Sequence, residues 1–260
     1  MAKVRQGAGQ AKRGERMTDE DLAARLADGA GRLLTELRRN RLLEGKALGH
    51  VGDRVANAFI LAALAEWRPQ DPILSEESPD RPERLASERV WIIDPLDGTR
   101  EYGEGRDDWA VHVALAIAGR PRVGAVALPA RGQLFRSDQC PAPPPSSRPR
   151  PLMLVSRTRP PSLAEALAAS LGAEIASMGS AGAKAAAVVA GDADLYFHSG
   201  GQHEWDNCAP AAVALGAGLH ATRIDGSPLL YNRAETVVPD LVVARPDLGE
   251  RVVAFCRSQR

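Results

Sequence analysis

The sequence has few cysteines, few aromatic residues and no net charge. Three cysteines in 260 residues, Cys140, Cys208 and Cys256, are too few and too widely spaced for a disulfide framework or a zinc site. A formal net charge of zero gives no overall field that favours nucleic acid or an acidic membrane. No apolar run is long enough to span a bilayer, and the first residues lack the apolar core of a signal peptide. We therefore expect a cytoplasmic protein that binds a small molecule, with no nucleic-acid or membrane partner.

The first part of the chain predicts a tail and two helices. Residues 1–16 are rich in Lys, Arg, Gly and Gln and show no apolar period, which is typical of a disordered basic tail. Apolar residues then recur at helical spacing over 22–37 and again over 56–67. Asp53 comes just before the second stripe, and the helix dipole favours an acid at a helix start. We expect Asp53 to open the second helix.

The most informative stretch is residues 90–99, VWIIDPLDGT. Its four leading apolar residues predict a strand buried on both faces, and Pro95 should end that strand because proline donates no hydrogen bond. In the turn that follows, Asp97 can lie beside Asp94 while the Leu96 carbonyl loses its ladder partner. Three oxygens then converge, and Mg²⁺ prefers oxygen ligands. An Asx-rich turn without any function would satisfy the same short motif.

Two neighbouring features can extend this site. Gly98 and Thr99 offer backbone N–H groups and a hydroxyl that can cradle a phosphate. The short apolar run at 73–75 predicts a second strand, which ends in Glu76 and Glu77. Adjacent residues of an extended chain face opposite ways, so only one of the two glutamates is expected to join the acidic cluster.

The remaining pattern predicts an antiparallel meander followed by an α/β half. Strand 109–117 alternates and should be half-buried, with His112 on its other face as an ordinary sheet residue. Strands at 122–128 and 133–136 continue the meander, and the proline-rich residues 139–151 are typical of a linker. Beyond it, strands at 152–155, 174–178 and 194–197 alternate with helices at 162–171, 180–190 and 207–216, the last capped by Asp206. The predicted division is a tail at 1–16, an N-terminal α+β half at 17–138, the linker, and a C-terminal α/β half at 152–260.

Four sequence pieces occur in a familiar order. They are Glu-Glu-Ser at a strand end, Trp-Ile-Ile-Asp-Pro-Leu-Asp-Gly-Thr, a Gly-Ser-x-x-x-Lys helix start, and Trp-Asp before an alanine-rich helix. From about Asp19 to about Asn232 the composite resembles the inositol monophosphatase superfamily of Mg²⁺-dependent phosphatases. The resemblance implies an α/β (α+β) fold, a layered αβαβα sandwich of the inositol monophosphatase and fructose-1,6-bisphosphatase type. It leaves a homodimer as one candidate assembly.

The resemblance also implies roles, position by position. The implied ligands for two or three Mg²⁺ ions are Glu76, Asp94, the Leu96 carbonyl, Asp97 and Asp206. Thr99 and Glu76 resemble the pair that orients the attacking water, and Asp53 matches a catalytic-site carboxylate near the metals. Glu77 is then left outside the ligand set. Two metals about 3.5 to 4 Å apart can acidify water and neutralise the phosphate, which agrees with these roles.

Within the superfamily the resemblance is strongest to the 3′(2′),5′-bisphosphate nucleotidases of the CysQ type, which act on 3′-phosphoadenosine 5′-phosphate (PAP). The runs at 97–102 (DGTREY), 179–184 (GSAGAK) and 204–206 (EWD) carry that likeness. Inositol phosphatases place a hydroxyl-reading glutamate where Ser199 stands, so a polyol substrate is disfavoured. The implied activity is removal of the 3′-phosphate of PAP, or of its sulfated form PAPS, in sulfur assimilation.

The same resemblance predicts the substrate contacts. They are Leu96, Asp97, Gly98, Thr99, Gly179, Ser180, Lys184 and Asp206. Lys184 is the expected partner of the phosphate that is not cleaved, although a solvated helix lysine is the plainer interpretation. Residues 156–159 (SRTR) resemble a nucleotide-contact region more weakly.

Two other functions compete with this interpretation. The same scaffold hosts phosphatases of inositol 1-phosphate and of fructose 1,6-bisphosphate, and the metal ligands do not discriminate among these substrates. A catalytically silent nucleotide-binding regulator is the alternative from another class. The intact acids and Thr99 argue against a silent protein, because loss of function usually shows first among such ligands.

Overall fold

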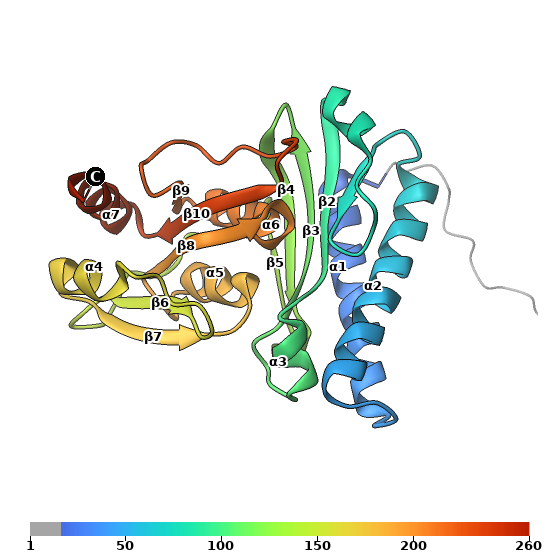
Figure 1. The fold of residues 1–260 in the computed structure, drawn as a ribbon, viewed down its shortest axis with the longest axis horizontal. Helices are drawn as coiled ribbons and strands as arrows, with labels where there is room; N and C mark the ends of the chain where they lie inside the picture. The colour runs from blue at the N-terminus through green and yellow to red at the C-terminus, as the bar shows by residue number, and fades with distance from the viewer. Residues whose placement is uncertain (1–16, 260) are drawn as a thin grey trace, which may run out of the picture.

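The computed structural model describes residues 17–259, so the predicted tail at 1–16 lies outside the described residues. Two long helices come first, α1 (Asp19–Arg39) and α2 (Gly45–Trp67), and they pack side by side (Figure 1). α1 begins as its sequence suggests, because the Thr18 hydroxyl accepts a hydrogen bond from the Asp21 N–H. Its buried residues recur along one face.

The first sheet is the predicted meander. Its strands are β1 (Ile73–Ser75), β2 (Arg89–Asp97), β3 (Ala110–Ile117), β4 (Arg120–Leu128) and β5 (Gln133–Arg136), and they lie in that order. β1 is parallel to β2, and every later pair is antiparallel. The turns β3–β4 and β4–β5 are short, and the 3₁₀ turn η2 (Pro129–Arg131) forms the second.

The second sheet contains the later strands in the order β7-β6-β8-β10-β9. They are β6 (Leu152–Ser156), β7 (Glu174–Met178), β8 (Leu195–His203), β9 (His220–Thr222) and β10 (Val237–Ala244). α4 (Ala164–Leu171) and α7 (Pro246–Ser258) cover its outer face, and α5 (Ala181–Ala190) and α6 (Glu204–Gly216) lie between the two sheets (Figure 1). The layers are therefore helices, sheet, helices, sheet and helices, which confirms the predicted αβαβα sandwich.

The first sheet is buried on both faces, so the prediction of a half-buried β3 was wrong. Residues 110–116 are all buried, because α1 and α2 cover one face while α5 and α6 cover the other. On β3 the residues packed toward α5 and α6 include Ala110, Ala114 and Ala116, and a Cβ on Gly124 of β4 would lie 2.7 Å from the Ala209 carbonyl oxygen. The alternation in the sequence therefore marks bulky and small residues on two buried faces, rather than buried and exposed ones.

Three predicted element boundaries near the site also need correction. α2 begins at Gly45, so Asp53 lies within the helix instead of opening it. β2 continues past Pro95 to Asp97, with a shift of register against β3 between Asp94 and Asp97. α6 begins at Glu204 with His203 as its N-cap, which makes Asp206 its third residue rather than its cap.

Packing explains why α2 starts before its apolar stripe. Gly49 and Gly52 lie where α2 approaches the loop at the end of β2, and a Cβ on Gly49 would lie 2.7 Å from Thr99 Cγ2. Gly103, at the end of the short helix α3 (Thr99–Gly103), makes a similar close approach to Gly45. These contacts stabilise a helical turn that intrinsic propensity disfavours.

The proline-rich residues 139–151 connect the two sheets. The central hydrophobic cluster contains side chains of both sheets, such as Ile92 from β2 and Tyr196 from β8, together with α5 and α6. The division into two halves stays a proposal, and the shared core argues that they fold as one unit. No helix among the described residues is long and apolar enough to cross a membrane.

Candidate active site

The metal loop is the irregular end of β2. The Leu96 N–H donates to Asp94 Oδ1 at 3.1 Å, so the carboxylate of Asp94 shapes the turn that follows it. Gly98 has φ 88°, a conformation that favours glycine, and it directly precedes α3. The chain thus reverses direction within three residues and places Thr99 at the first position of a helix.

Three carboxylates meet at this loop. One oxygen from each of Asp94, Asp97 and Asp206 lies within 4.8 Å of the others. Asp206 arrives from the first turn of α6, where its Oδ2 accepts the His203 N–H at 2.5 Å. The most distant pair, Asp94 and Asp206, is separated by 112 positions in the chain. The packing of the two sheets brings these residues together. The predicted approach of Asp97 to Asp94 is confirmed.

Asp53 and Thr99 form a second contact beside the cluster. The Thr99 hydroxyl lies 3.1 Å from Asp53 Oδ2 and also 3.1 Å from the Leu96 carbonyl oxygen. Asp53 is buried on α2, and its other oxygen, Oδ1, has no hydrogen-bond partner among the described residues. A buried carboxylate oxygen without a donor is costly unless a cation or water satisfies it.

Glu76 and Glu77 follow β1 at the rim of the site, and both are exposed. Neither belongs to the tight group of three acids. Asn57 of α2 holds this segment: its Oδ1 accepts the Ser75 hydroxyl at 2.8 Å, and its Nδ2 donates to the Glu77 carbonyl at 3.3 Å. The predicted role of Glu76 as a ligand therefore stays a prediction.

The acids of the site repel one another. The pKa of Asp53 is raised to about 7 and that of Glu76 to about 8, and the pKa values of Asp94 and Asp206 are also raised. Removal from water by the surrounding protein is the main cause in each case, and the negative charge of neighbouring carboxylates adds to it. This holds for Glu76 although its side chain is partly exposed.

Asp97 is the exception. Burial alone would raise the pKa of its carboxyl, but His112, Lys184 and the Ser180 hydroxyl outweigh burial and lower that pKa. Oδ2 of Asp97 accepts the Ser180 hydroxyl and, at 2.7 Å, the Gly182 N–H. His112 on β3 and the start of α5 therefore together favour the ionised form of this one carboxylate.

These residues fit a divalent cation. The donor set consists of oxygen atoms, which Mg²⁺ and similar hard ions prefer. Four crowded carboxyl groups with raised pKa values and the unpaired Oδ1 of Asp53 are the features that a positive ion would relieve. The described residues thus form an acidic cluster that can hold a metal ion.

A cavity of about 480 Å³ opens directly beside the cluster. All of the predicted substrate contacts except Leu96 line it: Asp97, Gly98, Thr99, Gly179, Ser180, Lys184 and Asp206. Residues 156–159, after β6, line it as well. Arg157 is held by Glu101 at 2.7 Å and by Glu104 at 3.0 Å, whereas the exposed guanidinium of Arg159 has no ion-pair partner among the described residues.

Lys184 is buried rather than solvated. Its ammonium donates to the Gly179 carbonyl at 3.1 Å and also contacts the carbonyls of Met178 and Ser180. It lies 5.0 Å from the ring centre of Tyr196. Burial lowers the pKa of this lysine to about 8. Its three hydrogens are thus directed at the loop between β7 and α5.

Sequence reasoning missed several polar residues of this cavity. Tyr196, His198 and Gln202 all come from β8, which continues to His203 instead of stopping at 197. Gln202 Nε2 donates to the Tyr196 hydroxyl at 2.9 Å. Both ring nitrogens of buried His198 lack a partner among the described residues. Only the alternation of Tyr196 and His198 along a strand could have signalled them.

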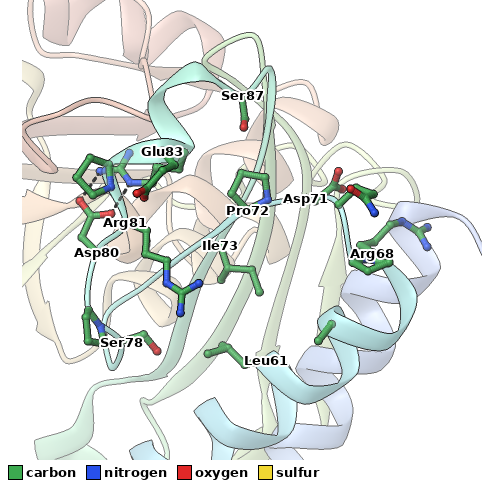
Figure 2. A pocket seen from close by; sticks show the side chains of 16 residues that line it. Leu61, Arg68, Asp71, Pro72, Ile73, Ser78, Asp80, Arg81, Glu83 and Ser87 are labelled. Carbon is green, nitrogen blue, oxygen red and sulfur yellow. Dashed lines mark hydrogen bonds and ion pairs between the residues drawn. The ribbon is translucent and has the colours of Figure 1, made fainter.

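The larger cavity of the structure, about 1010 Å³, is elsewhere. It lies between the end of α2, the start of β1 and the 3₁₀ turn η1 (Pro82–Ala86), and it contains no predicted site residue (Figure 2). Its buried cation, Arg84, is already paired with Asp80 at 2.6 Å. The smaller cavity beside the acids is therefore the better candidate for catalysis.

Comparisons with known proteins agree with this placement. Residues 19–254 match the inositol monophosphatase family. The 3′-phosphoadenosine 5′-phosphate phosphatase of Mycobacterium leprae (strain TN) is 48% identical over 256 residues, covering 93% of this chain and 94% of the relative. The 3′(2′),5′-bisphosphate nucleotidase CysQ of Escherichia coli (strain K12) is 32% identical over 197 residues, covering 71% of this chain and 79% of the relative.

A solved structure supports the fold. The crystal structure of CysQ from Bacteroides thetaiotaomicron, described as a bacterial member of the inositol monophosphatase family, aligns with a TM-score of 0.78. The alignment covers 88% of this chain and 98% of that one at 23% identity. At that identity the likeness bears on the fold alone.

Proposed function

This chain belongs to the inositol monophosphatase family, and we propose that it is a metal-dependent phosphomonoesterase that removes the 3′-phosphate of PAP. The products are AMP and inorganic phosphate, and PAPS would yield the corresponding sulfated nucleotide. The name and 48% identity of the mycobacterial relative support this substrate. The intact set of acids in the candidate site supports a metal-dependent phosphatase, whichever phosphate ester is the substrate.

The observation that carries the proposal is the position of the acids relative to the cations. Asp97 and Asp206 line the same cavity as Arg157 and Arg159. Its volume of about 480 Å³ is within the range of small-molecule sites, about 300 to 1,000 Å³. A substrate with two phosphates can place one near the acidic cluster and the other near the arginines.

We propose Mg²⁺ as the metal, in two or three positions. Asp94, Asp97 and Asp206 would hold it, with Glu76 and the Leu96 carbonyl as further oxygen ligands. When bound, such ions neutralise the charge of the phosphate and lower the pKa of an attacking water.

Thr99 is the residue we propose to orient that water. Its single hydrogen can be donated to Asp53 Oδ2 or to the Leu96 carbonyl, which leaves an oxygen lone pair free to accept from water. Asp53, which accepts the Thr99 hydroxyl on one oxygen, is the carboxylate that we propose to take up the proton. Glu76 at the rim is the second carboxylate proposed for this role.

For the second phosphate the contacts favour Arg159 over Lys184. The ammonium of Lys184 contacts three carbonyl groups, whereas the guanidinium of Arg159 is exposed in the same cavity without an ion-pair partner in the described part of the chain. A guanidinium also matches the geometry of a phosphate in two-point contacts. The sequence-based role of Lys184 as a phosphate ligand stays a prediction.

One experiment separates the candidate functions. Phosphate release by the purified protein is measured with PAP, inositol 1-phosphate and fructose 1,6-bisphosphate at equal concentration, with Mg²⁺ and after chelation. We expect the highest kcat/KM on PAP and no turnover without metal. A preference for either sugar phosphate would overturn the substrate, and binding of PAP without any turnover would identify a silent regulator.

Three further expectations remain proposals. A homodimer, a cytoplasmic location and the absence of a nucleic-acid partner rest on the sequence and on the family resemblance. The size of the protein in solution, measured by light scattering, tests the first of these.

A further inference from the structure

His112 is a buried polar residue in the middle of β3, and the proposed mechanism does not use it. Its side chain has no exposed surface. Ala110 and Ala114, which lie on the same face of the strand, are small and leave room for the helices between the sheets. A large polar ring is therefore an exception on this face.

The ring touches three separate elements. Its Nδ1 lies 3.1 Å from the Trp205 carbonyl oxygen in the first turn of α6. Its Nε2 lies 3.2 Å from Asp97 Oδ2. A Cβ on Gly182 would be 2.1 Å from the same nitrogen, so the start of α5 packs directly against the ring.

Hydrogen-bond accounting defines what the ring can do there. A carbonyl oxygen only accepts, so Nδ1 must carry a hydrogen. Nε2, on the other side of the ring, faces the Asp97 carboxylate at 3.2 Å. The Nε2 contact is not aligned well enough to count as a hydrogen bond, and no other polar atom among residues 17–259 satisfies this nitrogen. His112 thus contacts the backbone of α6 through Nδ1 and faces Asp97 through Nε2.

The contact matters because of what else holds Asp97. Oδ2 accepts the Ser180 hydroxyl and the Gly182 N–H, and His112 faces this same oxygen. The Ser180 hydroxyl donates its single hydrogen to Asp97, and its oxygen accepts the Ala183 N–H at 3.0 Å. No described residue donates to Oδ1 of Asp97. One carboxylate oxygen is therefore anchored, and the other is left for a ligand.

We propose that His112 is a positioning residue that joins Asp97 to the start of α6, and so keeps Asp206 beside Asp97 and Asp94. Asp97 lies at the end of β2 and Asp206 in the first turn of α6, and His112 is the side chain that contacts both the carboxylate of one and the backbone next to the other. This inference rests on the proposed metal site. It does not depend on which phosphate ester is the substrate.

The test compares three substitutions that divide the two contacts. In His112→Gln the amide nitrogen can reach the place of Nε2 and contact Asp97, whereas in His112→Asn it takes the place of Nδ1 and contacts Trp205. His112→Leu removes both contacts. Val126→Ala, directly opposite His112 on β4, is the matched control for a change in the buried sheet.

The readout is Mn²⁺ binding by the substrate-free protein, measured from the electron paramagnetic resonance signal of free Mn²⁺. Residues that orient metal ligands typically contribute 10- to 100-fold in affinity. We expect a rise in Kd of about that size for His112→Leu, a smaller rise for His112→Gln and His112→Asn, which each keep one of the two contacts, and a rise below roughly threefold for Val126→Ala. Thermal unfolding without metal shows which variants fold.

Each other outcome overturns a defined part of the proposal. Equal Kd values for the Gln, Asn and Leu variants would overturn the positioning role. If His112→Leu does not fold, the Gln and Asn variants decide, and wild-type affinity in both would overturn it. Absence of Mn²⁺ binding by the wild type would overturn the ligand set with it. Failure to hydrolyse PAP, with the expected Mn²⁺ pattern retained, would overturn only the proposed substrate.

Discussion

Thr99 Oγ1 lies 3.1 Å from Asp53 Oδ2, although the two residues are on different helices and 46 positions apart. The short helix α3 presents the hydroxyl, and α2 approaches closely enough to meet it because Gly49 has no Cβ to strike Thr99. The pair therefore exists only through the packing of α2 against the metal loop.

This contact predicts a loss of rate in Thr99→Ala. The variant keeps the acids but lacks the hydroxyl that orients the water, so kcat on PAP should fall by about 10²- to 10⁴-fold while KM changes little. Steady-state kinetics at saturating Mg²⁺ provide the measurement. Thr35→Ala, which removes a hydroxyl from α1 far from the site, is the matched control and should keep its rate. An unchanged kcat with a raised KM would instead assign Thr99 to substrate binding.

A second prediction concerns Asp206. Asp206→Asn keeps the shape of the side chain but removes one negative charge from the group of three acids, so turnover should fall by more than the roughly 10- to 100-fold typical of residues behind a metal ligand. The comparison is Asp247→Asn, the same change in the first turn of α7, which should be silent. Activity is titrated with Mg²⁺ in both variants. Near-normal turnover of Asp206→Asn at every Mg²⁺ concentration would leave Asp206 as a helix-start residue only.

A third prediction separates Arg159 from Lys184. A charge-assisted contact to phosphate is worth about 1.5 to 3 kcal/mol, or roughly 10- to 100-fold in kcat/KM. Arg159→Ala should lower kcat/KM for PAP by that factor and leave inositol 1-phosphate unaffected. Lys184→Met should lower kcat/KM for both substrates by a similar factor. It should also lower Tm, because the Lys184 ammonium contacts three backbone carbonyls.

The ratio between the two substrates is the measured quantity. A selective loss on PAP in Lys184→Met, with Arg159→Ala unchanged, would restore Lys184 as the phosphate ligand. A parallel loss in both variants would show that neither residue discriminates between the substrates.

A fourth prediction is a pH dependence of stability through His198. Burial, with the charges of Lys184 and Arg159, lowers the pKa of this ring to about 4 from its ordinary value of 6.5. The unfolded chain therefore binds a proton at a higher pH than the folded one, and stability is lost as the pH falls from 6.5 toward 4. Between pH 7 and pH 5 this loss should be on the order of 2 kcal/mol.

Urea unfolding at the two pH values measures this effect. His198→Asn should show a smaller loss of unfolding free energy between pH 7 and pH 5 than the wild type. His50→Asn, a substitution at an exposed histidine, should show the wild-type loss. Equal losses in all three proteins would mean that His198 is not held in its neutral form.

The sequence alone was sufficient for the family, the layered fold and the loop at 94–97. The family and the layered fold came from the resemblance of the composite motifs, whereas the loop depends on local pattern: an apolar run that must be buried, a proline, and acids that follow directly. The approach of Asp97 to Asp94 follows from the same short turn and is confirmed by the structure. Asp206 was found through resemblance, because nothing local to it distinguishes an acid in a helix start from a ligand.

What only the tertiary structure decided depends on contacts between distant segments. The plainer interpretation of the sequence places Lys184 on a solvent-exposed helix surface. In the structure it is buried, because α5 lies between the two sheets. His112 reads as an ordinary strand residue, and it faces Asp97 and α6 only because both faces of β3 are covered. Asp53 lies inside α2 because packing against α3 extends the helix to Gly45. Such placements follow from long-range packing, and periodicity within a single segment carries no information about it.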